Sequence, residues 1–139
     1  MRAILIDPRL RRVVNIALKG DDDEQLKAMH MLIRAETLNG GISINTHRDQ
    51  LWLDDLGAFA QPSCFAFRLH GSGPFCGIGI IIGTSGAGKT QEPVASAREI
   101  EAVVDWLDEI IPEVHIEDSS PDAPIAVFRQ FVTYKRVKG

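Results

Sequence analysis

The apolar residues of this 139-residue chain come in short runs, each about the length of a β-strand. The longest run, Gly77 to Gly83, reaches strand length only, and no run approaches the roughly 20 apolar residues that cross a bilayer. Several runs alternate between apolar and polar residues, as Val13–Leu18, Gln50–Asp54 and Phe65–Leu69 do. This alternation is typical of strands with one buried face, so the chain is expected to build a sheet.

Turn signals separate these runs. Asp7-Pro8 stops a first strand at Ala3–Ile6, which is expected to form a hairpin with Val13–Leu18. Asn39-Gly40-Gly41 predicts a turn before a strand at Ile42–Asn45. The other expected elements are a loop at His70–Pro74, a buried strand at Gly77–Ile82, and strands at Val114–Ile116 and Ile125–Tyr134.

Two segments carry helix signals, and the first begins at an acidic run. Asp21–Glu24 supplies an N-cap and first-turn carboxylates, which favour the positive end of a helix dipole. The helix is expected over Asp22–Ala35, because Leu26, Met29 and Ile33 form an apolar stripe at helical spacing.

The second helix signal is a capping box. Ser96-Ala97-Arg98-Glu99 has the spacing at which two side chains satisfy free backbone N–H groups of the first turn. The helix is expected to run from Ser96 to Pro112, which ends it. Its apolar face is expected to pack on the sheet and comprises Ile100, Val103, Val104, Leu107 and Ile111.

Together these elements predict an α+β fold: a mainly antiparallel, strongly twisted sheet of five to seven strands with two packed helices. The length suits a single domain over residues 1–139, in which we find no internal repeat or linker. A hydrophobic content of 45% with 24% charged residues indicates a globular chain rather than a disordered one.

One segment matches a nucleotide-binding pattern. Gly83-Thr84-Ser85-Gly86-Ala87-Gly88-Lys89-Thr90 fits the phosphate-loop pattern G-x-x-x-x-G-K-[ST] and follows a buried strand. In such a loop the glycines turn backbone N–H groups toward the phosphates, the lysine reaches the outer phosphates and the threonine holds Mg²⁺. On this interpretation the chain binds ATP or GTP through Gly83, Gly88, Lys89 and Thr90.

The surrounding sequence favours a Gly-rich surface loop instead. A phosphate loop opens a helix, whose N-terminus faces the phosphates. Here Pro93 falls inside the helix that Gly88 would open, where its ring would clash with the carbonyl of Lys89 at a cost of roughly 3 kcal/mol. Such proteins also need an apolar strand that ends in an Asp to hold Mg²⁺. The nearest candidate is Val114-His115-Ile116-Glu117-Asp118, in which His115 interrupts the apolar run. We therefore expect Lys89 to be exposed on a loop, and no cofactor.

The remaining polar residues predict no catalytic set and no metal site. The four histidines are scattered, and a metal site from His47 and Asp49 would rest on two loop residues. Cys64 is conceivable as a nucleophile with a histidine, but no oriented pair is evident. Asp54 and Asp55 are adjacent, so in a strand they point to opposite faces, and a turn is the simpler interpretation.

Composition bears on compartment and partners. A formal net charge of −4 argues against a nucleic-acid binder, although the basic segments Arg9–Arg12 and Lys135–Lys138 leave a nucleic-acid-associated accessory role as a weaker alternative. The N-terminal segment lacks the pattern of a signal peptide and no membrane partner is expected. We therefore expect a cytoplasmic protein in which Cys64 and Cys76 are reduced.

The order of three motifs resembles a known group. The motifs are Met1-Arg2-Ala3-Ile4-Leu5-Ile6-Asp7-Pro8, Asp54-Asp55-Leu56-Gly57, and Gly77-Ile78-Gly79-Ile80-Ile81-Ile82-Gly83-Thr84. This order is similar to a family of short uncharacterised proteins carried by phages, plasmids and bacterial genomes, and the likeness covers Met1 to Thr84. The resemblance implies a mobile-element context. Because the family has no established activity, it implies no chemistry.

The leading expectation is thus a small non-enzymatic binding or interaction protein, with nucleotide binding through Gly83–Thr90 as the alternative. The C-terminal run Ile125–Tyr134 has apolar residues on both faces, so both faces are expected to be covered. The cover is either a second subunit, giving a symmetric dimer through this strand, or one helix on each face of a central strand.

Overall fold

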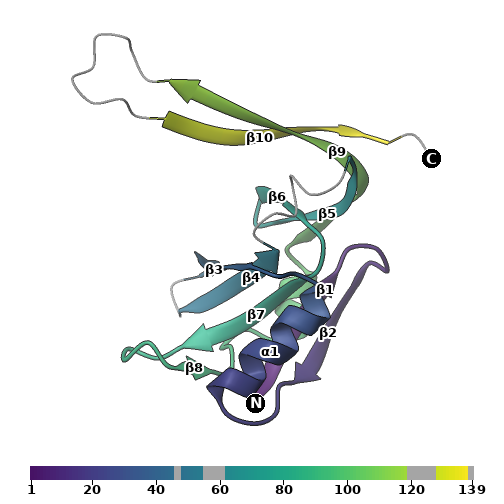
Figure 1. Cartoon of the computed structure of the whole chain (residues 1–139). Helices are drawn as coiled ribbons and strands as arrows, with labels where there is room; N and C mark the ends of the chain where they lie inside the picture. Colours follow the sequence, from purple (N-terminus) through teal and green to yellow (C-terminus); the bar gives the residue numbers. More distant parts are fainter. Residues whose placement is uncertain (46–47, 55–61, 119–127, 138–139) are drawn as a thin grey trace.

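The computed structural model describes residues 1–45, 48–54, 62–118 and 128–137, which form two sheets and two helices (Figure 1). The first sheet, sheet A, has six strands in the order β2-β1-β7-β4-β3, with β8 also paired to β7. Its strands are β1 (Arg2–Asp7), β2 (Arg12–Ala17), β3 (Leu38–Ser43), β4 (Asp49–Asp54), β7 (Gly79–Thr84) and β8 (Thr90–Gln91).

The second sheet, sheet B, has four strands in the order β10-β9-β5-β6. Every strand pair of both sheets is antiparallel, which confirms the expected antiparallel α+β character. The expected single sheet is wrong, because β5 pairs with β9 and leaves sheet A. The strands of sheet B are β5 (Cys64–Leu69), β6 (Ser72–Cys76), β9 (Val104–Asp118) and β10 (Phe128–Arg136).

Sheet A is covered on both faces, which explains why its central strand β7 is apolar and buried from Gly79 to Gly83. Helix α1 (Asp22–Ile33) covers one face with Met29 and Ile33. Helix α2 (Ala97–Glu101) and strand β5 cover the other face. The cluster on that second face comprises Ile4, Ile6, Leu51, Leu53, Phe67, Leu69, Ile81, Ala95 and Ile100.

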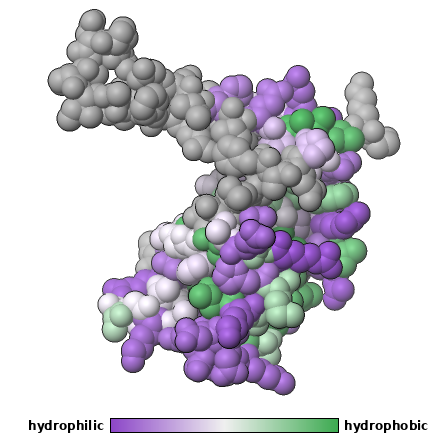
Figure 2. Space-filling view, viewed as in Figure 1, coloured by the Kyte–Doolittle hydropathy of each residue, from purple (hydrophilic) through white to green (hydrophobic). Residues whose placement is uncertain are grey.

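The acidic run caps α1 as expected. Asp21 is the N-cap, its carboxylate accepts a hydrogen bond from Glu24 N at 2.9 Å, and the Glu24 side chain accepts one from Asp21 N in return. The outer face of α1 is solvated, and Figure 2 shows mainly hydrophilic side chains on this side of the molecule with small apolar patches between them. Met31 is the most exposed of these apolar residues, at 78%.

The second helix begins where the capping box predicts and ends much earlier. Ser96 is the N-cap and its box with Glu99 is complete, but α2 has only 5 residues. The expected helical continuation to Pro112 is wrong, because β9 starts at Val104 and runs for 15 residues. Pro112 is tolerated in β9 because the pairing with β5 ends at Ile110, so the strand has one neighbour there.

A β-bulge explains why β9 has the apolar spacing of a helix. Phe67 pairs with Trp106 and Ala66 pairs with Asp108, so Leu107 is an extra residue in β9. The bulge shifts the alternation of buried and exposed side chains in β9 by one residue. Leu107 and Ile110, which are three residues apart, are therefore both buried, as two residues on one helix face would be. The sequence pattern therefore could not separate the two structures.

Two expected glycine turns also take part in strands. Asn39-Gly40-Gly41 lies within β3 at a bulge. Gly40 contacts the Trp52 ring so closely that a Cβ at this position would lie only 2.3 Å from it. The glycine is required for this close approach and not for a turn. The expected loop at His70–Pro74 is a tight hairpin between β5 and β6, in which His70 and Gly71 have φ angles of 51° and 75°.

Candidate functional site

The segment that matches the phosphate-loop pattern is the hairpin between β7 and β8. Its backbone N–H groups are used within the hairpin: Ser85 N donates to Lys89 O at 2.8 Å and Gly88 N donates to Ser85 O at 2.9 Å. Ser85 Oγ accepts from Ala87 N and Lys89 N at 3.3 and 3.1 Å. These four N–H groups are therefore not turned toward an anion, and a strand follows the lysine in place of a helix.

The glycines of this pattern have structural reasons of their own. A Cβ on Gly83 would lie 2.5 Å from Glu92 O, and Gly88 has a φ of 78°, which closes the hairpin. Lys89 is exposed, as expected. Thr90 Oγ1 donates a hydrogen bond to the Asp22 carboxylate at 3.0 Å, so the hydroxyl that would hold Mg²⁺ in a phosphate loop is bonded to a side chain of α1. The structure thus brings Gly83, Gly88, Lys89 and Thr90 together without forming a phosphate cradle.

A cavity of about 230 Å³ adjoins this hairpin and the first turn of α1. Figure 1 shows β8, the start of α1 and the N-terminus at the same end of the molecule. The floor of the cavity is apolar and is formed by Leu18, Met29 and Ile82, each no more than 3% exposed. Asp22 and Thr90 lie at its edge, so its lining changes from apolar to acidic between floor and mouth.

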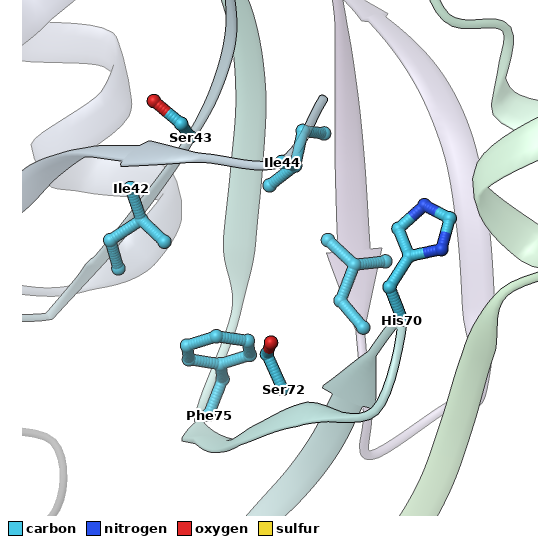
Figure 3. A pocket seen from close by; sticks show the side chains of 7 residues that line it. Ile42, Ser43, Ile44, His70, Ser72 and Phe75 are labelled. Atoms are coloured by element: carbon cyan, nitrogen blue, oxygen red, sulfur yellow. The ribbon is translucent and has the colours of Figure 1, made fainter. Parts of the chain in front are cut away.

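The second cavity has a volume of only about 90 Å³ and lies between β3 and the β5–β6 hairpin. Figure 3 shows Ile42, Ile44 and Phe75 around it, while the Ser43 side chain points away from them. His70 lines the same gap, but within the described residues its ring has no hydrogen bond to a serine. This cavity is a packing gap between the two sheets, and it holds no nucleophile and base in contact.

Of the expected metal pair His47 and Asp49, His47 lies outside the described residues. Asp49 is fully buried and accepts hydrogen bonds from Val94 N at 2.8 Å and from Ala95 N at 2.9 Å. Asn45 Nδ2 donates to the same carboxylate at 2.9 Å. Asp49 therefore fixes the segment before α2 to sheet A, which is a structural task.

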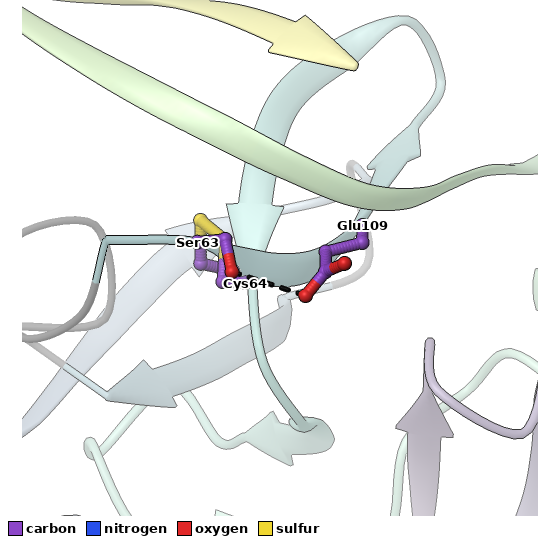
Figure 4. The surroundings of a disulfide bond; sticks show 4 residues. Ser63, Cys64 and Glu109 are labelled. Carbon is purple, nitrogen blue, oxygen red and sulfur yellow. Dashed lines mark hydrogen bonds between the residues drawn. A yellow bond between two sulfur atoms is a disulfide. The ribbon is translucent and has the colours of Figure 1, made fainter. Parts of the chain in front are cut away.

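The expectation that both cysteines are reduced is wrong in this structure, because Cys64 of β5 and Cys76 of β6 form a disulfide with a Cα–Cα distance of 5.8 Å. Figure 4 shows the pair beside Ser63, whose hydroxyl donates to Glu109 at 3.0 Å. The cysteines belong to a small apolar cluster with Ile110, which pairs with Cys64 where β5 and β9 lie side by side. Cys64 is consequently not available as a nucleophile.

The other titratable candidates have structural partners. His30 Nδ1 lies 2.9 Å from Ala35 O after the end of α1, and His115 Nε2 lies 2.8 Å from Thr133 Oγ1 across sheet B. Asp54 ends β4, and its neighbour Asp55 lies outside the described residues. Across residues 1–45, 48–54, 62–118 and 128–137, no group of three His, Cys, Asp or Glu side chains is arranged to hold a metal ion.

One ion pair ties the two sheets together. Arg11 in the β1–β2 turn donates to the Asp108 carboxylate from Nε at 2.8 Å and from Nη2 at 2.6 Å. This hydrogen bonding lowers the pKa of Asp108 and raises the pKa of Arg11. Both residues have left-handed φ angles, 52° for Arg11 in the turn of sheet A and 59° for Asp108 at the bulge of sheet B.

In the part of the chain that the structure describes, β10 and the part of β9 from Ile111 to Asp118 form a two-stranded ribbon. The pairs of this ribbon run from Ile111 with Lys135 to Asp118 with Phe128, whereas β5 pairs with β9 only up to Ile110. Strand β10 has β9 as its single neighbour in the described sheet, and Figure 1 shows both strands running away from the body. The rival expectation of a central C-terminal strand is therefore wrong.

The base of the ribbon is fixed to the body by Tyr134. Its ring packs on the cluster around the disulfide, and Arg68 approaches it with the guanidinium 5.4 Å from the ring centroid. Arg68 Nη2 also donates to the Tyr134 hydroxyl at 3.2 Å, and Val137 N donates to Glu109 O at 3.0 Å. These contacts join the start of the ribbon to the body.

No family model, curated protein or solved structure matches this chain. The resemblance to phage and plasmid proteins thus stays a prediction. In the part of the chain that the structure describes, neither helix is long and apolar enough to cross a membrane.

Proposed function

We propose that this protein is a non-enzymatic interaction protein and that the free edge of β10 is its contact surface. The observation that carries the proposal is the ribbon itself, in which a 9-residue edge strand runs beyond the last pair between β5 and β9. A mobile-element context, as the resemblance implies, is compatible with such a role and adds no chemistry to it.

A two-stranded ribbon requires contacts beyond its own strand pairing to be stable. An isolated two-stranded hairpin is marginally stable in water, and a long edge strand exposes unpaired backbone groups that pair readily with another chain. Sheet B supports the ribbon at its base through Tyr134, but the described pairing gives the outer part of β10 no second neighbour. Addition of a strand to this edge would satisfy those groups, and strand addition is a common mode of protein recognition.

The occupant we propose is a second copy of this chain. Two copies that pair antiparallel through the same edge form a closed, symmetric contact, the most frequent arrangement of soluble oligomers. Antiparallel pairing centred on Phe131 places Phe128 opposite Tyr134 of the second copy and Arg129 opposite Thr133, so no two basic residues of β10 are directly opposed. The sequence of the strand is thus compatible with pairing to itself.

Site-specific photo-cross-linking tests the proposal in the cells that encode the protein. A photoreactive amino acid replaces Thr133, which is exposed on β10, and in a matched control it replaces Met31, which is exposed on α1. We expect one discrete adduct from position 133, at about twice the chain mass of 15.3 kDa, and none from position 31.

The mass of the adduct separates the possible occupants. An adduct of another discrete mass supports the interaction role and replaces the second copy by a different protein. The proposal is overturned if position 133 yields no adduct, or if both positions yield the same products.

A further inference from the structure

The cavity beside α1 combines apolar and acidic lining residues. Its floor, with Leu18, Met29 and Ile82, continues the apolar core between α1 and sheet A, and the half-buried ring of Trp52 forms a wall. Gly40 of β3 packs directly on the Trp52 ring, so the ring is held in place from behind. An apolar cavity of about 230 Å³ with a fixed aromatic wall suits a flat apolar group of fragment size.

The mouth of this cavity is acidic. Asp22 and Asp23 of the first turn of α1 both line it, and Thr90 Oγ1 fixes the Asp22 carboxylate with its 3.0 Å hydrogen bond. In the described residues no ion pair within 4.0 Å involves either carboxylate. The ammonium group of Met1 also lines the cavity, and it keeps its positive charge while it donates to Leu18 O at 2.9 Å. Among the charged groups of the lining, the carboxylates of Asp22 and Asp23 outnumber this single cation, so the lining has an excess of negative charge.

We propose that this cavity binds a small organic cation, in which a protonated amine is joined by a short chain to an apolar ring. The ring lies on the apolar floor against Trp52, and the ammonium group lies at the mouth beside Asp22 and Asp23. Both halves of the ligand are needed: the side chains of Leu18, Met29 and Ile82 offer no hydrogen-bond partner to a polar group, and the acidic mouth attracts positive charge and repels phosphates. Within the described residues, the one polar atom of the Trp52 ring, Nε1, is buried and has no hydrogen-bond partner. This site is independent of the β10 edge and of the proposed self-association.

Ligand titration with Trp52 as the reporter tests the proposal. The chain has two tryptophans, so the variant Trp106→Phe leaves Trp52 as the source of indole fluorescence. Phenethylamine is the cationic probe, 3-phenylpropanoate is its anionic counterpart of similar shape, and Mg-ATP tests the nucleotide interpretation. We expect phenethylamine to change the fluorescence with saturation at a dissociation constant of about 1 mM or below, and the two anions to give no saturating change.

Charge variants separate the site from nonspecific attraction. In the variant Asp22→Asn with Asp23→Asn we expect phenethylamine to bind about tenfold more weakly or worse, because the charges that attract the amine are gone. The matched control is Glu101→Gln, which removes a negative charge from the exposed end of α2 and is expected to leave the affinity unchanged. Thermal melting of each variant reports whether it is folded.

Four results overturn the proposal. The first is equal binding of 3-phenylpropanoate, and the second is unchanged phenethylamine affinity in the double variant. The third is the absence of any saturating response to phenethylamine up to about 10 mM. A saturating response to Mg-ATP also contradicts it, because an acidic mouth is incompatible with a nucleotide.

Discussion

At the scale of single residues, the fold depends on a few polar side chains that connect segments far apart in the sequence. Arg11 and Asp108 join the β1–β2 turn to the bulge of β9, and Asp49 joins β4 to the segment before α2. None of these contacts is visible in the sequence as a pattern, because their partners are set by tertiary structure. Sequence reasoning considered Asp49 as a metal ligand with His47, whereas its carboxylate accepts backbone N–H groups.

The Arg11–Asp108 pair predicts a specific pH dependence of stability. Because Arg11 lowers the pKa of Asp108 below 3.8, the folded state favours the charged carboxylate. The resulting stabilisation is present above the pKa of the unfolded chain and is lost as the pH falls through the lower pKa of the folded chain. Asp108→Asn should therefore be less stable than the parent protein at pH 7, and the difference should vanish at low pH.

Urea denaturation between pH 7 and pH 2 measures this difference, with Asp105→Asn as the control on the same strand. The effect should be small and should shrink in high salt, since both partners are about half exposed. A difference between Asp108→Asn and the parent that grows as the pH falls would show that the pair does not act as described.

At the scale of elements, the segment before α2 is held from two sides. Asp49 accepts from Val94 N and Ala95 N, and Arg2 Nη2 donates to Pro93 O at 2.6 Å and to Ala95 O at 3.2 Å. With only 5 residues, α2 cannot persist through its own hydrogen bonds. Its position therefore depends on these anchors and on the burial of Ile100.

Asp49→Ala should destabilise the fold by about 1–3 kcal/mol, because it leaves buried backbone N–H groups without an acceptor. Urea denaturation measures the loss, and the matched control is Asp105→Ala, an exposed carboxylate on β9 that should change stability by no more than about 0.5 kcal/mol. If the two variants are equally stable, the anchor role of Asp49 is refuted.

The elements that sequence reasoning placed well have local signals. The β1–β2 hairpin, α1 with its capping box, β4, β5 and the buried strand β7 follow from alternation, caps and apolar runs. The errors arise where a tertiary contact overrides the local signal. The bulge at Leu107 imitates helical spacing, and Gly40 serves the Trp52 ring instead of a turn.

The candidate sites are harder to predict from the sequence than the helices and strands are. The Gly83–Thr90 pattern is recognisable in the sequence, and Pro93 correctly indicates that no helix follows it directly. The cavity is not predictable from local patterns, since its lining comes from Met1, from Leu18 after β2, from α1, from β4 and from the β7–β8 hairpin. The sequence predicts β10 as a strand with apolar residues on both faces but does not place it at the edge of a sheet. Strand order depends on tertiary contacts, which local patterns do not reveal.

At the scale of the whole molecule, two sheets are joined at their centre and a ribbon leaves the second one. Sheet A carries the cavity at one end, and sheet B carries the ribbon, so the two proposed surfaces use different parts of the fold (Figure 1). The disulfide and Tyr134 lie on one cluster at the base of the ribbon. The body therefore contacts the base of the ribbon, and the edge of β10 is the surface that we propose to pair with a second copy of the chain.

The mass of the purified protein in solution, measured by light scattering at micromolar concentration, tests this account most directly. Pairing of two β10 edges predicts a mass close to twice the 15.3 kDa of the chain. A mass of 15.3 kDa that persists as the concentration is raised would contradict the proposal that a second copy occupies the edge.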